Sequence, residues 1–398
     1  MTRGRALLTS AIPISVRRNL GRATKDLKVL PLVFNNPSAA NLILNGLESS
    51  LRRTKLLSYP LTLGMNLSNI CNQRCKFCVQ DNSKMETNNW ITADIFKSMK
   101  WLRFVPDIYL FAGSGEPLVN PHFPEIVKVV REVAPKSRIC MFTNGQALNG
   151  NNLDATVNYM DLVHISLNAV SKTAFDAVVR GDHSRVMNNL ESLSGRRNGL
   201  DVELSMVLTK HNQDEIVPMV DLAHDLGFSR VIACYFVPMA WPGNNIEFGA
   251  DDAPDKEYTE IRADEYKEYA KKHSIGLVLP QDTSGTRACM SPWRTAYISN
   301  DHIGEQVFRI CCSGFSMNTY MTLDSYTNFK RVWNSPRMQE IRRTVNLPAE
   351  QQNTMCRMCR EIPRSTPDWI EQRIACANES AEMEVTPFGL TCGRRILV

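Results

Sequence analysis

The amino-acid sequence predicts an α/β fold, with an open, partial (β/α)6 barrel followed by a small carboxyl-terminal domain. Six strand-like segments alternate with helix-like segments between residues 61 and 238, and such alternation is typical of a parallel sheet. Six units are too few to close an eight-stranded barrel, so we expect an open one. The second domain is predicted by a group of cysteines that begins at residue 289, after the last of these units.

Local patterns place each element along the chain. Short apolar runs rich in β-branched and aromatic residues predict the strands. In the first helix of the barrel, Ile95, Met99 and Leu102 recur at helical spacing and form one apolar face. We expect strands over residues 61–67, 107–112, 138–142, 162–167, 202–208 and 230–236, and helices over 93–103, 122–133, 153–159 and 214–226.

The composition is ordinary for a soluble globular enzyme, with 43% hydrophobic and 22% charged residues among 398. No apolar run reaches the roughly 18 residues that a transmembrane helix needs. Pro13, Arg17 and Arg18 interrupt any signal-peptide core near the amino terminus. Most of the twelve cysteines fall within residues 71–78 and 289–359, which favours metal binding. Because thiolates bind metals only while reduced, we expect a cytoplasmic protein.

The amino-terminal segment is strongly basic. Residues 1–58 hold ten Lys and Arg residues against two acidic ones, within a chain of net charge +5. One interpretation is an arm that contacts an anionic partner, such as a phosphorylated substrate, a membrane surface or nucleic acid. The interpretation we favour is a solvated helical extension. The arm lacks interleaved aromatic and basic residues and zinc-finger spacing, so we expect no DNA partner.

Cys71, Cys75 and Cys78 form a CxxxCxxC motif directly after the first predicted strand. Three thiols can converge on one metal centre but are one ligand short of a closed four-ligand shell. A four-iron cluster held by three thiolates leaves one iron open to a small-molecule ligand. A structural zinc site would need a fourth ligand close to this loop, and a disulfide framework is typical of small secreted chains. The motif therefore favours an iron–sulfur cluster.

This motif, with the aromatic Phe77 before its last cysteine, resembles the signature of the radical S-adenosylmethionine (radical SAM) superfamily. Residues 113–117, Gly-Ser-Gly-Glu-Pro, follow the second predicted strand and resemble the family's GGEP motif, with Ser114 in place of its first Gly. The resemblance implies a partial barrel, SAM, and a [4Fe–4S] cluster on Cys71, Cys75 and Cys78. It also implies contacts to the SAM cofactor from Phe77, Gly113, Ser114, Gly115, Glu116, Pro117, Ser166 and Asn168.

Residues that follow other predicted barrel strands have ordinary structural explanations as well as functional ones. Ser166 and Asn168 end the fourth predicted strand, where family members often contact the SAM ribose, but loop capping would also explain them. Residues 143–145, Thr-Asn-Gly, follow the third strand, and their Gly could simply be required by a turn. After the fifth strand, Lys210 and Asn212 could meet the SAM carboxylate.

The second cysteine group supplies four ligands, enough to close a cluster or a zinc site. Its arrangement resembles the Twitch form of the SPASM/Twitch extension, which implies one auxiliary [4Fe–4S] cluster. Cys311 fits the second ligand position better than Cys312, while Cys376 and Cys392 are too sparse for a further cluster. The implied auxiliary ligands are Cys289, Cys311, Cys356 and Cys359.

These assignments divide the chain into five parts. The parts are a basic extension (1–58), the barrel (59–260), a connector helix (261–285), the auxiliary-cluster domain (286–362) and a tail (363–398).

The resemblance implies reductive cleavage of SAM, hydrogen abstraction from a substrate C–H bond, and a flavodoxin, ferredoxin or reductase as electron donor. We expect oxidation of a sugar, aminocyclitol or glycoconjugate. The alternatives are a peptide maturase, a redox-neutral epimerase and, outside enzymes, an iron–sulfur electron carrier. Epimerisation commonly needs a thiol in the barrel, for which Cys140 and Cys234 are the candidates, although core packing also explains both.

Overall fold

The structure is a computed structural model of the whole chain. It describes residues 35–78, 90–111, 115–236, 247–280, 289–300, 306–311, 321–322, 326–353, 356, 383–386, 389–392 and 395–396.

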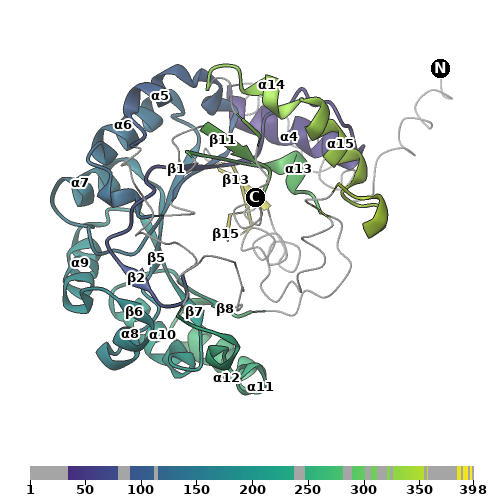
Figure 1. Cartoon of the computed structure of the whole chain (residues 1–398). Coiled ribbons are helices and arrows are strands. Elements are labelled where there is room, and N and C mark those ends of the chain that lie inside the picture. The colour runs from purple at the N-terminus through teal and green to yellow at the C-terminus, as the bar shows by residue number, and fades with distance from the viewer. Residues whose placement is uncertain are drawn as a thin grey trace.

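A single curved sheet of ten strands forms the body of the protein (Figure 1). Its strand order is β12-β11-β10-β1-β3-β4-β5-β7-β8-β9, and the eight strands from β10 to β9 run parallel. The strands are β1 (Thr62–Asn66), β3 (Asp107–Phe111), β4 (Arg138–Thr143), β5 (Leu162–Ser166), β7 (Asp201–Leu208), β8 (Arg230–Tyr235), β9 (Gly276–Val278), β10 (Thr295–Asn300), β11 (Gln306–Arg309) and β12 (Met321–Thr322).

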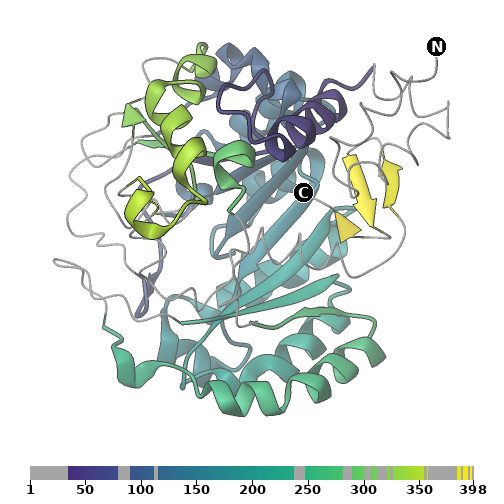
Figure 2. The ribbon, with the colours of Figure 1, turned by 90° about the vertical axis from the view of Figure 1, so that its right-hand side faces the viewer.

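Helices cover the outer side of this sheet, as Figure 1 shows for the arc from α5 to α12, while α4 and α13–α15 lie near β1 and β11. Figure 2 shows the same sheet from the side, with helices along its length. The helices are α4 (Pro37–Ser50), α5 (Ala93–Ser98), α6 (Phe123–Val133), α7 (Gly150–Tyr159), α8 (Lys172–Val178), α9 (His183–Arg196), α10 (Ile216–Asp225), α11 (Lys256–Ile261), α12 (Ala263–Lys272), α13 (Ser291–Arg294), α14 (Phe329–Trp333) and α15 (Pro336–Thr344).

Short elements complete the fold. A two-stranded ribbon pairs β2 with β6, and β13, β14 and β15 form a separate antiparallel sheet. These strands are β2 (Arg74–Cys75), β6 (Val179–Arg180), β13 (Met383–Thr386), β14 (Gly389–Cys392) and β15 (Arg395–Ile396). The 3-10 helices are η2 (Lys100–Phe104), η3 (Pro117–Val119), η4 (Gln213–Glu215), η5 (Ala250–Asp252) and η7 (Ala349–Gln351).

The predicted barrel is confirmed, because the six predicted strands are β1, β3, β4, β5, β7 and β8 in that order across the sheet. The helix predicted over residues 93–103 is wrong in its second half, where α5 ends at Ser98 and η2 follows. Tertiary packing explains the change. The Trp101 ring stacks on Phe329 at 4.3 Å between centroids, and its Nε1 donates to the Tyr326 carbonyl at 2.8 Å.

Four strands at the ends of the sheet were not predicted. β9 lies within the predicted connector (261–285), and β10, β11 and β12 lie within the predicted auxiliary domain (286–362). β10 pairs parallel with β1, placing Thr295 opposite Thr62. The domain boundaries remain predictions, but the sheet runs across both of these segments.

The two faces of the sheet differ in character because alternate residues of a strand point to opposite sides. Val163 and Ile165 belong to the large apolar core that includes helix residues. On the other face, Cys140 and Leu162 form a small apolar cluster with Tyr109. This second face is the inner face of the barrel.

Buried ion pairs cross the inner face near the amino-terminal ends of the strands. Arg138 Nε lies 2.7 Å from Asp107 Oδ1, and both side chains are at most 5% exposed. Glu203 lies 2.8 Å from His164 Nδ1 on one side and 2.8 Å from Arg230 Nη1 on the other. Each pair joins residues directly opposite one another on neighbouring strands, where side chains interact most strongly. The base of the barrel is therefore closed by the ion pairs Asp107–Arg138 and Glu203–Arg230, with His164 beside Glu203.

Replacing Arg138 by Ala should lower the free energy of unfolding by on the order of 3–5 kcal/mol, because the Asp107 carboxylate would stay buried without its partner. Chemical denaturation measures this change. The double variant Arg138→Met with Asp107→Leu removes both charges and should recover most of the loss. A double variant as unstable as Arg138→Ala would contradict this account.

Candidate functional site

The carboxyl ends of the parallel strands bring the predicted site segments to one rim of the barrel. The cysteine loop (residues 71–78) follows β1, and residues 115–117 follow β3. Residues 143–145 end β4, and residues 166–168 end β5. Hydrogen bonds described below join neighbouring segments directly. The rim is where barrel proteins of this class hold their reactive groups.

The three cysteines of the loop lie close enough to influence one another. Burial raises the pKa of the Cys71 thiol to about 11, and the nearby charges of Glu116 and Cys78 add to the rise. Burial also raises the pKa of Cys75, helped by Cys78 and Cys71. Gathering three thiols in a partly buried loop disfavours three thiolates unless a cation is present. A metal centre supplies that cation and deprotonates its thiol ligands.

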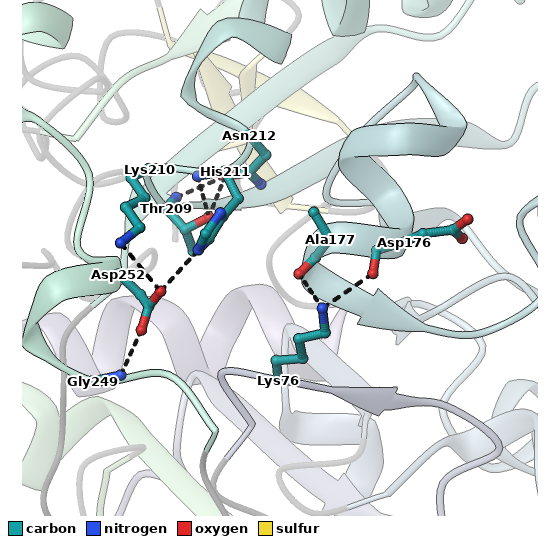
Figure 3. A network of polar contacts seen from close by, with 9 residues as sticks. All are labelled: Lys76, Asp176, Ala177, Thr209, Lys210, His211, Asn212, Gly249 and Asp252. Carbon is teal, nitrogen blue, oxygen red and sulfur yellow. Dashed lines mark hydrogen bonds and ion pairs between the residues drawn. The ribbon is translucent and has the colours of Figure 1, made fainter.

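Hydrogen bonds on two sides fix the loop at Lys76, between two of its cysteines. Lys76 Nζ donates to the carbonyls of Asp176 at 3.2 Å and Ala177 at 2.7 Å, at the carboxyl end of α8 (Figure 3). Its backbone carbonyl accepts from the amides of Glu247 at 2.9 Å and Phe248 at 3.2 Å. The ribbon of β2 and β6 places Cys75 opposite Val179. The spacing of the thiols is thus set by surrounding structure and not by the loop alone.

Glu116 is buried, and its carboxylate is held by protein groups. It accepts hydrogen bonds from Leu118 N at 3.1 Å, Thr143 Oγ1 at 2.6 Å and Asn144 N at 2.8 Å. Burial raises its pKa to about 7, against the lowering effect of these three hydrogen bonds. The predicted contact between Glu116 and the cofactor remains a prediction. In the structure its carboxylate joins the end of β3 to the end of β4.

Gly115 brings this turn against the segment that leads into the cysteine loop. Its φ is +129°, and a Cβ atom there would lie 2.5 Å from the Ser68 carbonyl oxygen. The next amide, Glu116 N, donates to the Ile70 carbonyl at 2.7 Å. Only glycine fits this approach without displacing the backbone. Pro117 begins η3, whereas the predicted cofactor residues Gly113 and Ser114 lie outside the described residues.

Asn144 lies in the predicted rim segment 143–145, but the sequence analysis assigned it no role of its own. Its Nδ2 lies 3.6 Å from Cys71 Sγ and 2.7 Å from Asn72 Oδ1, so it contacts the cysteine loop directly. Gly145 has a φ of +76°, which agrees with the expected turn. A polar residue directly after a barrel strand was the available signal.

Ser166 and Asn168 bind neighbouring protein groups. Ser166 Oγ lies 3.4 Å from Ser205 Oγ. Asn168 has a φ of +69°; its Oδ1 accepts from Val207 N at 3.1 Å and its Nδ2 donates to the Ser166 carbonyl at 3.2 Å. Asn168 thereby bridges the ends of β5 and β7. The predicted contact with the SAM ribose stays a prediction for both residues.

Of the two residues expected near the SAM carboxylate, Asn212 is fully engaged by the protein. Its side chain hydrogen-bonds Thr209 and the carbonyls of Asn168 and Val207. Figure 3 shows its neighbours Lys210 and His211 turned toward Asp252. The distance to Asp252 Oδ1 is 3.6 Å from Lys210 Nζ and 2.8 Å from His211 Nε2. The backbone amide of Gly249 also donates to Asp252 Oδ2 at 2.9 Å.

Phe77, the aromatic residue of the motif, begins a row of rings along the rim. Its centroid lies 6.5 Å from that of Phe236, which lies 6.1 Å from Phe248. His211 follows, with its ring centroid 5.0 Å from Phe248. The three phenylalanine rings form an apolar cluster beside the cysteine loop, with His211 at its end.

The two strand cysteines differ in accessibility. Cys140 is 0% exposed and packs against Tyr109 and Leu162. Cys234 is partly exposed and lies on β8 one residue before the strand ends, on the face opposite the core residue Ala233. Its Sγ lies 3.6 Å from the Met206 carbonyl, and burial raises the pKa of its thiol to about 11.

The described residues of the second cysteine group are anchored around α13 and α15. Cys289 precedes α13, and its backbone N and O both bond the Asn346 amide, at 2.7 and 3.0 Å. Cys311 follows β11, and the residue between them, Ile310, accepts a hydrogen bond through its carbonyl from Thr295 Oγ1 at the start of β10. Cys356 is buried and its amide donates to Asn353. Cys312, Cys359 and Cys376 lie outside the described residues, and for Cys392 only the backbone of β14 is described.

Fold and loop together define an open α/β barrel with a three-thiol loop at the carboxyl ends of its strands. The family model described as the radical SAM superfamily matches residues 65–249. This segment is therefore similar to the radical SAM superfamily, whose members use a [4Fe–4S] cluster and SAM.

Sequence relatives include GTP 3′,8-cyclases. The enzyme of Chlorobaculum tepidum is 29% identical over 165 residues, which cover 40% of this chain and 49% of that protein. The enzyme of Clostridium perfringens strain SM101 is 26% identical over 167 residues, 41% of this chain and 51% of its own length. The chain therefore spans about half the length of the curated relatives it matches.

Solved structures show the same fold. SuiB of Streptococcus suis bound to S-adenosylmethionine has a TM-score of 0.58 at 15% identity, covering 79% of this chain and 76% of that one. Native anSMEcpe with bound AdoMet has a TM-score of 0.54 at 14% identity, covering 78% and 92%. Among the helices within the described residues, none is long and apolar enough to span a membrane.

The residues present fit the superfamily's cluster. Over the described part of the chain, no three His, Cys, Asp or Glu side chains lie close enough to hold a single metal ion. A four-iron cluster is larger, and in general each thiolate binds a different iron of it. Cys71, Cys75 and Cys78 are mutually close and partly buried, and two N–H groups face Cys71 Sγ, from Gln73 at 3.4 Å and Asn144 at 3.6 Å. Such donors suit a thiolate ligand.

Replacing Glu116 by Gln should change how stability depends on pH. The pKa of Glu116 is raised from its usual 4.5 to about 7 in the folded protein, so its contribution to stability is present below pH 4.5 and lost as pH rises through 7. The unfolding free energy of Glu116→Gln relative to wild type should therefore rise between pH 5 and pH 8, by on the order of 3 kcal/mol at most. Chemical denaturation at both pH values measures this difference. Parallel pH profiles for the two proteins would refute it.

Proposed function

We propose that the protein is a radical SAM oxidoreductase that removes a hydrogen atom from a C–H bond of a hydroxylated small molecule. The observation that carries this proposal is the loop of Cys71, Cys75 and Cys78 at the carboxyl ends of the barrel strands, fixed at Lys76 from two sides. When bound, the cluster and SAM supply reductive cleavage of SAM and with it a radical able to attack an unactivated C–H bond.

The protein's own residues hold and shield the cofactors in this proposal. Cys71, Cys75 and Cys78 are the cluster ligands. Gly115 lets the turn after β3 approach the loop, and Glu116 locks that turn to the end of β4. The ring row that starts at Phe77 excludes water from one side, which protects a reactive radical. The main contribution of such a barrel to catalysis is to orient the substrate against the cofactor.

The proposed substrate class is a sugar, aminocyclitol or glycoconjugate. The name of the sequence relatives, GTP 3′,8-cyclase, describes action on a small molecule that contains a sugar, which supports this class over a peptide. A peptide maturase is the close alternative. An iron–sulfur electron carrier is the alternative outside enzymes, and assaying SAM cleavage on reduction separates it from both.

We also propose an auxiliary [4Fe–4S] cluster of the SPASM/Twitch type on Cys289, Cys311, Cys356 and Cys359. Its support is the anchoring of Cys289 by Asn346 and of the Cys311 segment by Thr295, together with the partial burial of Cys289 and Cys311 and the burial of Cys356. A second cluster could accept the electron that the substrate radical loses, which favours oxidation. A structural zinc site is the alternative.

The proposed electron donor is a flavodoxin, ferredoxin or reductase in the cytoplasm, where thiolate ligands stay reduced. The basic extension (1–58) could contact an anionic surface, although a solvated extension remains the interpretation we favour.

A second candidate function, redox-neutral epimerisation, gains support from Cys234. This residue is partly exposed on the inner face near the rim, and burial raises the pKa of its thiol, which keeps the thiol protonated and able to give a hydrogen atom. Cys140 is completely buried and less suited to that role.

Anaerobically purified protein should hold two four-iron clusters, about eight irons per chain. Replacing Cys71, Cys75 and Cys78 together by Ala should leave about half of the iron and abolish formation of 5′-deoxyadenosine. Replacing Cys356 and Cys359 should leave the other half, and SAM cleavage should persist while substrate turnover fails. Iron analysis and product chromatography measure these outcomes.

Two results would count against these assignments. Retained SAM cleavage in the triple variant would remove the cysteine loop from the mechanism. Release of zinc with full retention of iron in the Cys356 and Cys359 variant would make the second group a structural zinc site.

A reaction in D₂O separates oxidation from epimerisation, using a substrate found by screening hydroxylated small molecules. We expect a product two mass units lighter than the substrate, formed equally by wild type and Cys234→Ala. Cys140→Ala is the matched control, because that strand cysteine is buried away from the rim. A product of unchanged oxidation state, with solvent deuterium on an inverted carbon and lost only in Cys234→Ala, would establish epimerisation instead.

A further inference from the structure

Two N–H groups point at the sulfur of Cys71. The backbone amide of Gln73 donates to Sγ at 3.4 Å, as expected within a tight loop. The second donor, Asn144 Nδ2 at 3.6 Å, comes from the end of β4, far away in sequence. An N–H group directed at a sulfur atom favours its negatively charged, thiolate form.

The direction of the Asn144 amide is fixed by its other bonds. Its Oδ1 accepts from the backbone amide of Gln146 at 2.9 Å, which leaves Nδ2 facing the cysteine loop. One N–H of Nδ2 donates to Asn72 Oδ1 at 2.7 Å, and the other is directed at Cys71. A flipped amide would place an oxygen against both the sulfur and the Asn72 oxygen. The hydrogen bonds to Gln146 and Asn72 thus hold Asn144 Nδ2 in the orientation in which it donates to Cys71.

The turn that carries Asn144 is itself held from two sides. Its backbone amide donates to Glu116 Oε2 at 2.8 Å, and Glu116 also accepts from Thr143 Oγ1. On the other side, Asn189 Nδ2 donates to the carbonyls of Gly145 at 2.8 Å and Gln146 at 3.2 Å. Asn144 is therefore a fixed donor whose neighbours hold its backbone in place.

We propose that Asn144 is a positioning residue that tunes the cluster, by donating an N–H···S hydrogen bond to Cys71. This inference rests on the proposed function, in which Cys71 is a cluster ligand. An N–H dipole aimed at a thiolate sulfur stabilises the reduced cluster more than the oxidised one, because the reduced cluster is more negative. Hydrogen bonds to sulfur are among the factors that set cluster potentials. Asn144 thus makes the cluster easier to reduce and holds the Cys71 sulfur in place.

The test compares Asn144→Leu and Asn144→Asp with Asn189→Leu. Asn144→Asp keeps the size and the acceptor for Gln146 N but turns a carboxylate oxygen toward sulfur. Asn189→Leu loosens the same turn without removing any contact to Cys71. The readouts are a redox titration of the cluster without SAM, followed by absorbance, and the electron paramagnetic resonance spectrum of the reduced state.

In both Asn144 variants we expect the ratio of reduced to oxidised cluster at a fixed potential to fall several-fold, with altered g-values. A tenfold fall corresponds to about 59 mV for one electron. Asn189→Leu should titrate as wild type does. If Asn144→Leu is isolated without iron, the isosteric Asn144→Asp provides the same comparison.

Unchanged potentials in the Asn144 variants, or an equal shift in Asn189→Leu, would overturn the inference. Failure of the proposed function gives a different result. In that case wild type binds no cluster, or Cys71→Ala keeps the full iron content, and no comparison of potentials is needed to see it.

Discussion

The site depends on a buried carboxylate. Glu116 accepts hydrogen bonds from Thr143 and Asn144 at the end of β4 and from Leu118 within η3. Its own amide donates to the Ile70 carbonyl, one residue before Cys71. Three consecutive strand ends are therefore joined through one residue. A carboxylate can do this because it accepts several donors at once, and burial strengthens each bond at the cost of desolvating the charge.

Positions of the barrel strands could be predicted because each is a short apolar run, bounded by turn residues and separated by a helix. The α-helix predicted over 93–103 ends early because Trp101 lies in the 3-10 helix η2, where its ring stacks on Phe329, a residue far away in sequence. β10 was missed because its strand contains Thr295 and Ser299, polar residues that are nevertheless buried at 3% and 1% exposure. Tertiary contacts decided both cases, and no local pattern contains them.

For the site too, local features could be predicted from the sequence and tertiary contacts could not. The cysteine spacing and the glycine-rich turn are local and could be read from the sequence. The contact of Asn144 with Cys71 could not, because it requires the loop after β1 and the turn after β4 to meet at the rim. For Glu116, the role predicted from the motif differs from the contacts in the structure. Its motif predicted a group that faces a ligand, whereas its hydrogen bonds in the structure hold the backbone together.

The pairing of β10 with β1 constrains how this chain can be made. Thr62 faces Thr295, and Leu61 N donates to the Arg294 carbonyl, so β1 lacks one neighbour until almost three quarters of the chain has left the ribosome. Contacts of such long sequence separation slow folding, and an unpaired strand edge can pair with other chains meanwhile. During synthesis, one edge of the strand that leads into the cysteine loop thus stays unpaired until the segment around Thr295 is available. Chaperone binding and the timing of cluster insertion would both act on that interval.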